Sequence, residues 1–450
     1  MPSDRTVSVL VSCGERQLGV VGPFVTDRPR WHDVAPVAAH LTTVLQVPVV
    51  VLRLLDVEGG SGGLGGRVDY HAEALREPAA AVLAAASAAG ALRPAAPEEL
   101  APPAPHPRRA PYATADGSRA ALAWAGQRLT ELGRPAIGPV EQVKTWNLAG
   151  LFRLPTATGP VWLKTGRDFA ADEADMIGLV ASVDPSFVPP VLAADPARRL
   201  LLLDHVPGED CWGPSAAVVE AAVPRLVRVQ AALAARFPDG PPPNLPDRSP
   251  HLLPPALSAL LNGPAGAELT ADEAARAKLM ADQLPLLIER LGACGLPLTV
   301  LHGDFHPGNW RSTGTTGAPV VLVDFADGCY GHPAVDGLRP KDFTSAERWT
   351  QAAEAWSAAW RAAAPGSDPA TALRLAEPLS HLAYAVRYQE FLDGIEPSEE
   401  RYHAGDPAAE LRAALAAFEG LGAFQEPAVV EAPSVATAAV TTATATATHH

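Results

Sequence analysis

A short run of polar side chains near residue 300 contains the residue types that hold metal ions and phosphates. The run LHGDFHPGNW, from Leu301 to Trp310, places two histidines, an aspartate and an asparagine around proline and glycine. The apolar segment VVLVD follows it and ends in Asp324. Phosphoryl transfer from a nucleotide needs oxygen ligands for a metal ion and a carboxylate that receives the acceptor's proton. These two segments contain both.

The spacing in H-G-D-x-x-x-x-N assigns an expected role to each polar group. We expect Asp304 to accept or orient the proton of an acceptor hydroxyl, and Asn309 to offer a neutral oxygen to Mg²⁺. Asp324 is expected to bridge the metal and the phosphates. A lone aspartate in a loop is usually a turn former. Here the asparagine, the apolar run and the terminal aspartate occur in order, which favours the chemical interpretation.

The run HGDFHPGN followed by VLVDF resembles the aminoglycoside phosphotransferase and choline kinase family, small-molecule relatives of the protein kinases. The resemblance extends over residues 145–418. It implies a protein-kinase-like fold, ATP and Mg²⁺ as cofactors with GTP as an open alternative donor, and a small-molecule acceptor. It also implies that Asp304 is the catalytic base, that Asn309 and Asp324 are metal ligands, and that His302, His306 and Asp336 hold the loop in place.

A second group of residues is expected to bind the nucleotide. In PVWLKTG, Lys164 ends a predicted strand, as does the kinase lysine that binds the α- and β-phosphates. Glu173, on the following predicted helix, is expected to hold its ammonium group, with Asp172 and Asp175 as alternatives. The strand LLLLD ends at a predicted hinge between lobes, where the backbone of three residues is expected to meet the adenine: Asp204, His205 and Val206.

Several departures from the protein kinases favour a constitutive small-molecule enzyme. The turn TWNLAGLF has only Gly150 in place of a glycine-rich loop, so the sequence does not identify the residue that contacts phosphate. Asp324 is followed by Phe-Ala, where a regulated kinase has Phe-Gly. HGD replaces HRD, and no A-P-E segment follows. A catalytically silent nucleotide-sensing or regulatory protein of the same fold is the alternative, and the intact set of Lys164, Asp304, Asn309 and Asp324 argues against it.

The acceptor side is expected in a late acidic segment, YQEFLDGIEPSEERYHAGD. It suggests a cationic acceptor such as an aminoglycoside, amino sugar or amino alcohol, and a solvated acidic helix end is the alternative. Three tryptophans at helical spacing are expected to pack in the core. The acidic candidates are Glu390, Asp393, Glu396, Glu399 and Glu400, and the tryptophans are Trp349, Trp356 and Trp360.

These motifs are expected on an α+β, two-lobed protein-kinase-like fold preceded by a small α+β domain. The proline-rich stretch RPAAPEELAPPAPHPRRAP cannot be a helix interior, and the C-terminal segment has little to pack. The expected divisions are an N-terminal domain (1–92), a linker (93–112), a small lobe with a leading helix and hinge (113–208), a helical lobe (209–425) and a disordered tail (426–450).

The order of elements expected in the N-terminal domain is similar to that of a Nudix domain. The glutamate-rich helix that holds metal in that family is absent, so the resemblance implies a domain without hydrolase chemistry. The loop GGSGGLGG, residues 59–66, joins two predicted strands and lacks the lysine and hydroxyl of a P-loop. A hairpin connection is therefore predicted there.

Composition limits the partners. The 450 residues are 48% hydrophobic and carry a net charge of -15, typical of a soluble globular protein that does not bind nucleic acid or an anionic membrane. No secretory signal and no membrane span is recognised, so a cytoplasmic location is expected. The four cysteines are scattered, which predicts neither a zinc site nor a disulfide framework. The sequence does not determine the oligomeric state.

Overall fold

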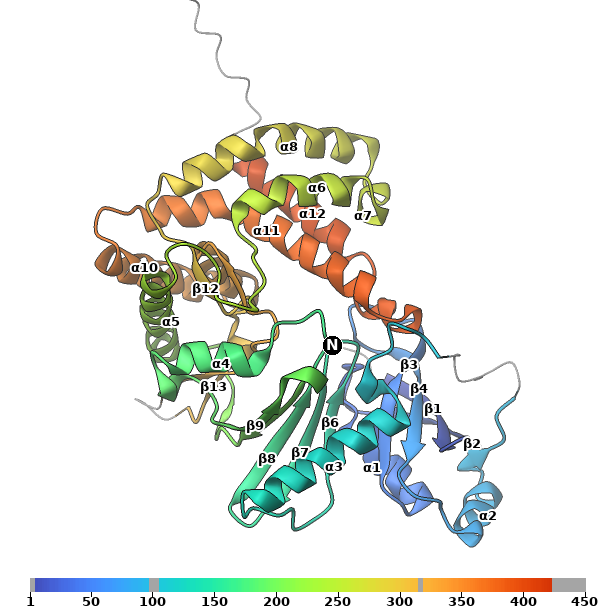
Figure 1. Ribbon diagram of the computed structural model, residues 1–450. Helices are drawn as coiled ribbons and strands as arrows, with labels where there is room; N and C mark the ends of the chain where they lie inside the picture. The colour runs from blue at the N-terminus through green and yellow to red at the C-terminus, as the bar shows by residue number, and fades with distance from the viewer. Residues whose placement is uncertain (1–4, 97–104, 315–318, 423–450) are drawn as a thin grey trace, which may run out of the picture.

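The computed structural model describes residues 5–96, 105–314 and 319–422 (Figure 1). The tail expected to be disordered, 426–450, and the middle of the predicted linker lie outside these residues. The described part contains two five-stranded sheets and a group of helices. The α+β class predicted from the sequence is confirmed. Within the described residues, no helix is both long enough and apolar enough to cross a membrane.

The first sheet is built from the N-terminal residues and has the strand order β3-β4-β1-β2-β5. Strands β1 and β4 are parallel, and the other neighbours are antiparallel. The glycine-rich loop connects the antiparallel strands β3 and β4, which confirms the predicted hairpin. The elements are β1 (Arg5–Cys13), β2 (Arg16–Thr26), α1 (Ala35–Leu45), β3 (Val49–Glu58), β4 (Gly66–Ala74), α2 (Ala80–Ala88) and β5 (Leu92–Arg93).

The second sheet forms the small lobe and is antiparallel throughout, in the order β6-β7-β8-β10-β9. Helix α3 (Ala115–Glu131) begins at Thr114, whose side chain accepts a hydrogen bond from the Gly117 N–H. Its apolar face, including Trp124 and Leu129, packs on this sheet. The other elements are β6 (Glu141–Thr145), β7 (Gly150–Thr156), β8 (Gly159–Thr165), α4 (Glu173–Ala181), β9 (Val191–Asp195) and β10 (Leu200–Asp204).

The rest of the chain is mainly helical and forms the large lobe (Figure 1). Trp356 and Trp360 are buried in its core, as predicted, and Trp349 packs partly buried against it. Short strands carry the polar motifs: β11 (Glu209–Asp210), β12 (Thr299–Leu301), β13 (Trp310–Ser312), β14 (Val321–Leu322) and β15 (Cys329–Gly331). The helices are α5 (Ala216–Arg236), α6 (Leu253–Leu261), α7 (Pro264–Ala267), α8 (Ala271–Gly292), α9 (Ala334–Leu338), α10 (Ala346–Ala363), α11 (Pro369–Gly394) and α12 (Asp406–Gly420).

The N-terminal sheet packs directly against both lobes. The Gln142 side chain on β6 donates to the Val51 carbonyl and accepts from the Val51 N–H, each at 2.7 Å. Tyr402, from the turn before α12, is buried in the core of the N-terminal sheet. The end of the predicted linker is packed as well, since Tyr112 is buried and its hydroxyl donates to the Trp146 carbonyl at 2.9 Å. The sheet is therefore held by specific contacts to both lobes.

Candidate active site

The C-terminal end of β8 brings a lysine to the base of α4. The Lys164 Nζ lies 2.8 Å from a Glu173 carboxylate oxygen and 2.5 Å from Asp324 Oδ1. Asp172 has a different role, because its carboxylate caps α4 by accepting from the N–H groups of Ala174 and of Asp175. Glu173, and not its acidic neighbours, is thus the carboxylate that pairs with Lys164.

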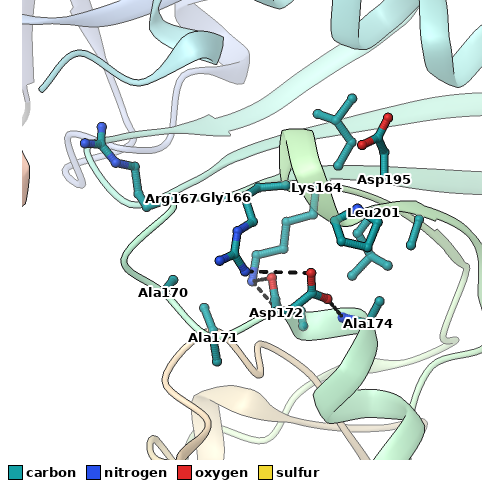
Figure 2. Close-up of a pocket in the computed structure, with 15 residues that line it drawn as sticks. Lys164, Gly166, Arg167, Ala170, Ala171, Asp172, Ala174, Asp195 and Leu201 are labelled. Atoms are coloured by element: carbon teal, nitrogen blue, oxygen red, sulfur yellow. Dashed lines mark hydrogen bonds and ion pairs between the residues drawn. The ribbon is translucent and has the colours of Figure 1, made fainter. Parts of the chain in front are cut away.

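Glu173 connects three segments that are distant in the sequence. Besides pairing with Lys164, it accepts a hydrogen bond from the Phe325 N–H at 2.9 Å. Burial alone would lower the pKa of Lys164, but the Asp324 and Glu173 carboxylates outweigh burial and raise it. The lysine is consequently a permanent cation at the cleft. Figure 2 shows a cavity that Lys164 lines, between α4 and the turn that joins β9 to β10. Its volume of about 30 Å³ is enough for water and too small for a nucleotide.

The loop that carries Asp304 is fixed by a buried aspartate. Asp336 accepts from the His302 N–H at 2.7 Å, from the Gly303 N–H at 2.9 Å and from the Gln230 side chain at 2.8 Å. Burial raises the pKa of Asp336 to about 7. Gly303 has φ of 84°, and a side chain there would meet the Asp327 carbonyl at 1.9 Å, so the glycine of H-G-D is sterically required.

His302 and His306 shape the same loop from two sides. The ring Nε2 of His302 lies 3.1 Å from the Val323 carbonyl, which joins the loop to the strand before Asp324. The ring Nδ1 of His306 accepts from the Gly308 N–H at 3.0 Å. Both histidines therefore occupy loop-holding positions, as the family resemblance implies.

The Asp304 carboxylate lies in a pocket of donors. Arg339 Nε donates to its Oδ1 at 2.7 Å, and Asn309 Nδ2 donates to its Oδ2 at 3.0 Å. The His306 Nε2 is 3.2 Å from the same Oδ2. Burial would raise the pKa of Asp304, but Arg339 and His306 outweigh it and hold the pKa well below its usual range. The carboxylate is ionised at neutral pH and can accept a hydrogen bond from an acceptor hydroxyl.

The donor set near Asp324 fits a magnesium ion bound together with phosphates. The Val323 N–H donates to the Asn309 carbonyl at 3.0 Å, so the two predicted metal ligands lie on adjoining backbone. Because the Asn309 amide NH₂ is bonded to Asp304, its oxygen is the atom left for a metal. The described residues contain no cluster of three or more histidine, cysteine or acidic ligands. One carboxylate and one amide match the way Mg²⁺ binds when substrate phosphates complete its shell.

Asp324 has an uncommon backbone conformation. Its φ is 67°, in the left-handed region that aspartate and asparagine tolerate better than most residues. Its carboxylate is turned to Lys164, which holds the pKa of Asp324 below its usual value against the effect of burial. Strain of this kind is concentrated at functional sites.

At the predicted hinge, the side chains of Asp204 and His205 form hydrogen bonds within the protein, and one backbone N–H group has no partner among the described residues. The Asp204 carboxylate accepts from Arg134 and from the His205 N–H, each at 3.0 Å. The His205 ring lies 3.1 Å from the indole nitrogen of Trp162. The Val206 N–H has no hydrogen-bond partner among the described residues. A free donor of this kind is what an adenine edge requires.

The acidic segment expected to receive a cation has other partners. Glu396 pairs with Arg109 at 2.8 Å, and Glu399 is buried and accepts from the Leu54 N–H at 2.8 Å. Glu390 pairs with Arg248 at 2.6 Å and with Arg387 at 3.1 Å. Glu390 is thus paired within the large lobe, whereas Glu399 joins that lobe to the N-terminal sheet. All three carboxylates already have partners, and their binding of a cationic acceptor stays a prediction. Asp327, to which the sequence assigned no role, pairs with Arg387 at 2.7 Å.

A row of aromatic rings and an arginine lie beside Asp304 and were not predicted from the sequence. The rings of Trp212 and His306 stack at 5.3 Å between centroids, and those of His306 and Phe343 at 4.4 Å. Trp212 is 50% exposed. Arg339 lies over the rings of Phe343 and Tyr384. These residues fall in segments without a recognisable motif, so only their position in space identifies them.

Comparison with known proteins gives the family. The profile of the phosphotransferase enzyme family matches residues 152–372, which include the Lys164, Asp304 and Asp324 positions. No curated protein sequence matches the chain.

The solved structures that match this chain include a kinase family protein, a kinase and a phosphotransferase. A choline/ethanolamine kinase family protein from Mesorhizobium loti is 15% identical, with a TM-score of 0.46 over 66% of this chain and 98% of that one. A choline kinase from Streptococcus pneumoniae is 12% identical, with a TM-score of 0.47 over 67% and 99%. A macrolide 2'-phosphotransferase from Brachybacterium faecium is 18% identical, with a TM-score of 0.41 over 64% and 98%.

The profile match begins in β7 and ends in α11, and it spans both the Lys164–Glu173 pair and the Asp304 loop. Residues 152–372 of this chain belong to the phosphotransferase enzyme family.

Proposed function

We propose that this protein transfers the γ-phosphoryl group of ATP, with Mg²⁺, to a hydroxyl of a small molecule. The observation that carries the proposal is the convergence of Lys164, Glu173 and Asp324 in one ion-paired cluster, joined through the Val323–Asn309 hydrogen bond to the Asp304 loop. Such a cluster combines a phosphate-binding cation, metal ligands and a base, and these are the parts that phosphoryl transfer needs.

The nucleotide would enter between the lobes. The free Val206 N–H would donate to the adenine edge, and Lys164 would exchange its hydrogen bond with Asp324 for the α- and β-phosphates. Glu173 would keep the ammonium in place because it is also fixed by the Phe325 N–H. Asn309 and Asp324 would hold the Mg²⁺, which neutralises phosphate charge when bound.

The acceptor hydroxyl would hydrogen-bond to Asp304. As its oxygen forms the new bond to the γ-phosphorus, the bond from that phosphorus to the ADP oxygen breaks, and the hydroxyl proton passes to Asp304. The depressed pKa keeps Asp304 ready to accept a hydrogen bond but makes it a weak base. The proton therefore moves late, when the attacking oxygen has lost most of its electron density to phosphorus.

A panel of hydroxy compounds is needed to identify the chemical class of the acceptor. The sequence pointed to aminoglycosides, amino sugars and amino alcohols. Because Glu390, Glu396 and Glu399 are engaged in ion pairs or buried hydrogen bonds, the panel should include neutral and acidic hydroxy compounds alongside these cations.

The proposal is tested by coupled ADP release with each acceptor, followed by mass detection of the phosphorylated product. Product that needs ATP, Mg²⁺ and the Asp304 carboxylate supports it. A protein that binds Mg·ATP but forms no phosphorylated acceptor with any class would instead support the silent nucleotide-sensing alternative.

A further inference from the structure

Arg339 is placed to do more than hold the base. Its Nε donates to Asp304 Oδ1 at 2.7 Å, and its guanidinium carbon lies 4.3 Å from the ring centre of Tyr384 and 4.7 Å from that of Phe343. The Tyr384 hydroxyl donates to the Gly303 carbonyl at 3.1 Å, so that ring is fixed to the loop that carries Asp304. The guanidinium thus contacts two aromatic rings, which help to hold this planar cation in place.

Most of the hydrogen-bonding capacity of Arg339 is unused. A guanidinium has five N–H donors, and among the described residues only the Nε of Arg339 donates a hydrogen bond. Asp304 is also its one carboxylate partner there. The two terminal nitrogens remain to form the bidentate contact that arginine makes with carboxylates and phosphates.

A second arginine approaches the same region from the connection between β2 and α1 of the N-terminal domain. The guanidinium of Arg30 lies 6.0 Å from the ring centre of Trp212, which stacks on His306 beside Asp304. The described residues contain no carboxylate within ion-pair distance of Arg30. Nearby, Glu390 and Asp327 are paired with two arginines, Arg248 and Arg387. Two guanidinium groups, those of Arg339 and Arg30, therefore lie near the base, although the whole chain carries a net charge of -15.

From this arrangement we propose that the acceptor is an anionic hydroxy compound, with a carboxylate or phosphate group close to the hydroxyl that is phosphorylated. Arg339 binds that group through its two terminal nitrogens, and Arg30 adds a second positive charge across Trp212. The inference rests on the proposed function and narrows its acceptor from the amino-bearing classes to acidic ones.

The test uses acceptors that differ only in charge, with the full-length protein. Gluconate is compared with gluconamide and glycerate with glyceramide, first by calorimetric binding in the presence of Mg·ADP and then by kcat/KM with Mg·ATP. The variants are Arg339→Met, Arg339→Lys and, as a matched control, Arg153→Met, an exposed arginine paired with Glu141 on the small lobe.

We expect wild type and Arg153→Met to prefer each carboxylate over its amide by roughly tenfold or more, the weight of one charge-assisted hydrogen bond. Arg339→Met should bring that ratio close to one, and Arg339→Lys should restore part of it because lysine keeps the charge but loses the planar fork. A residue that only positioned Asp304 or contacted the transferred phosphoryl group would slow both acceptors equally and leave the ratio unchanged.

The proposal is overturned if wild type shows no preference for the carboxylate in binding or in turnover, or if Arg339→Met keeps the preference. Failure of the proposed function has a different signature, because carboxylate-selective binding would then persist without any phosphorylated product.

Discussion

At the scale of single residues, the site depends on which oppositely charged group each side chain contacts. Lys164 lies between two carboxylates, whereas Asp304 lies among Arg339, Asn309 and His306. Each arrangement stabilises the charged form of the central group. Lys164, which we propose binds phosphate, and Asp304, which we propose meets the acceptor hydroxyl, are thus both charged in the absence of substrate.

The first prediction concerns Asp304. Asp304→Asn should lower turnover by at least roughly a hundredfold, the usual contribution of general acid–base catalysis, because the amide cannot accept the proton. Mg·ATP affinity should change by less than about twofold, since Asp304 acts on the acceptor. Stopped-flow measurement of the reaction rate and calorimetric titration with Mg·ATP separate the effect on turnover from the effect on nucleotide affinity. An equal loss of affinity and rate would argue against this role.

The second prediction concerns Asp324. Asp324→Asn should abolish most of the tightening of ATP binding by Mg²⁺, because its carboxylate is the one charged metal ligand proposed here. Asp175→Asn, an exposed aspartate on α4, is the control. ATP titrations with and without Mg²⁺ measure the difference. If the variant retained the full Mg²⁺ effect, another group would have to hold the metal.

The sequence predicted the site residues that belong to a contiguous motif, and it did not predict those that lie outside one. Asp304, Asn309 and His302 lie within ten residues of each other, so their spacing carries information. Arg339 contacts Asp304 from a short helical segment 35 residues later, in a stretch of ordinary composition. No local pattern marks such a contact, because it depends on how the segment after α9 folds onto the Asp304 loop.

At the scale of elements, the loop that carries Asp304 owes its shape to α9. Asp336 lies in the first turn of α9 and receives two backbone N–H groups from the loop that follows β12. The pairing of β12 with β15 ends at Leu301, and the positive φ of Gly303 turns the chain away from strand geometry. The two N–H groups therefore need a partner outside the strand pairing. The orientation of Asp304 is therefore determined by a residue on a different element.

The third prediction follows from this anchor. Asp336→Ala should destabilise the protein by about 3 kcal/mol or more, because it leaves the buried His302 and Gly303 N–H groups without a partner. Activity should fall with it, since Asp304 loses its fixed position. Denaturant unfolding measures the stability, and Asp393→Ala, an exposed aspartate, should change it by no more than about 0.5 kcal/mol. A fully stable Asp336→Ala would show that the loop holds itself.

At the scale of the whole molecule, the N-terminal sheet is joined to the large lobe through buried polar groups. The carboxylate of Glu399 accepts from the Leu54 N–H, and its other oxygen has no partner among the described residues. Burial raises the pKa of Glu399 to about 8, with Glu396 adding to the rise. The oxygen without a partner suits a carboxyl group that keeps its proton at neutral pH.

The fourth prediction is a pH dependence of that junction. Between about pH 4.5 and 8 the unfolded chain has lost the Glu399 proton and the folded chain still holds it. The free energy of unfolding therefore falls as pH rises through this range, by up to about 1.4 kcal/mol per pH unit. Glu399→Gln should flatten the decline, whereas Glu400→Gln should not. Denaturant unfolding curves at pH 5, 6.5 and 8 give the unfolding free energy of each variant. If that free energy changed equally with pH in both variants, the raised pKa of Glu399 would be contradicted.

The contacts between the N-terminal sheet and the lobes could not be predicted from sequence. The strands of the sheet follow from their valine-rich alternation, and the proline-rich stretch marks a boundary. The residues that the sheet contacts in the lobes cannot be read from the sequence. Glu399 and Leu54 are 345 residues apart, and a glutamate in an acidic segment is ordinarily exposed. We propose that the N-terminal domain shapes the acceptor side, since its Arg30 reaches Trp212.

The most direct test of the central claim is acceptor-stimulated release of ADP from Mg·ATP, measured side by side for wild type and Asp304→Asn. We expect wild type to bind Mg·ATP, and at least one hydroxyl acceptor in a panel of cationic, neutral and acidic compounds to accelerate ADP release and to be recovered in phosphorylated form. Asp304→Asn should bind the nucleotide but give no acceleration. Failure of wild type to bind Mg·ATP, or equal acceleration in the two proteins, would contradict the claim.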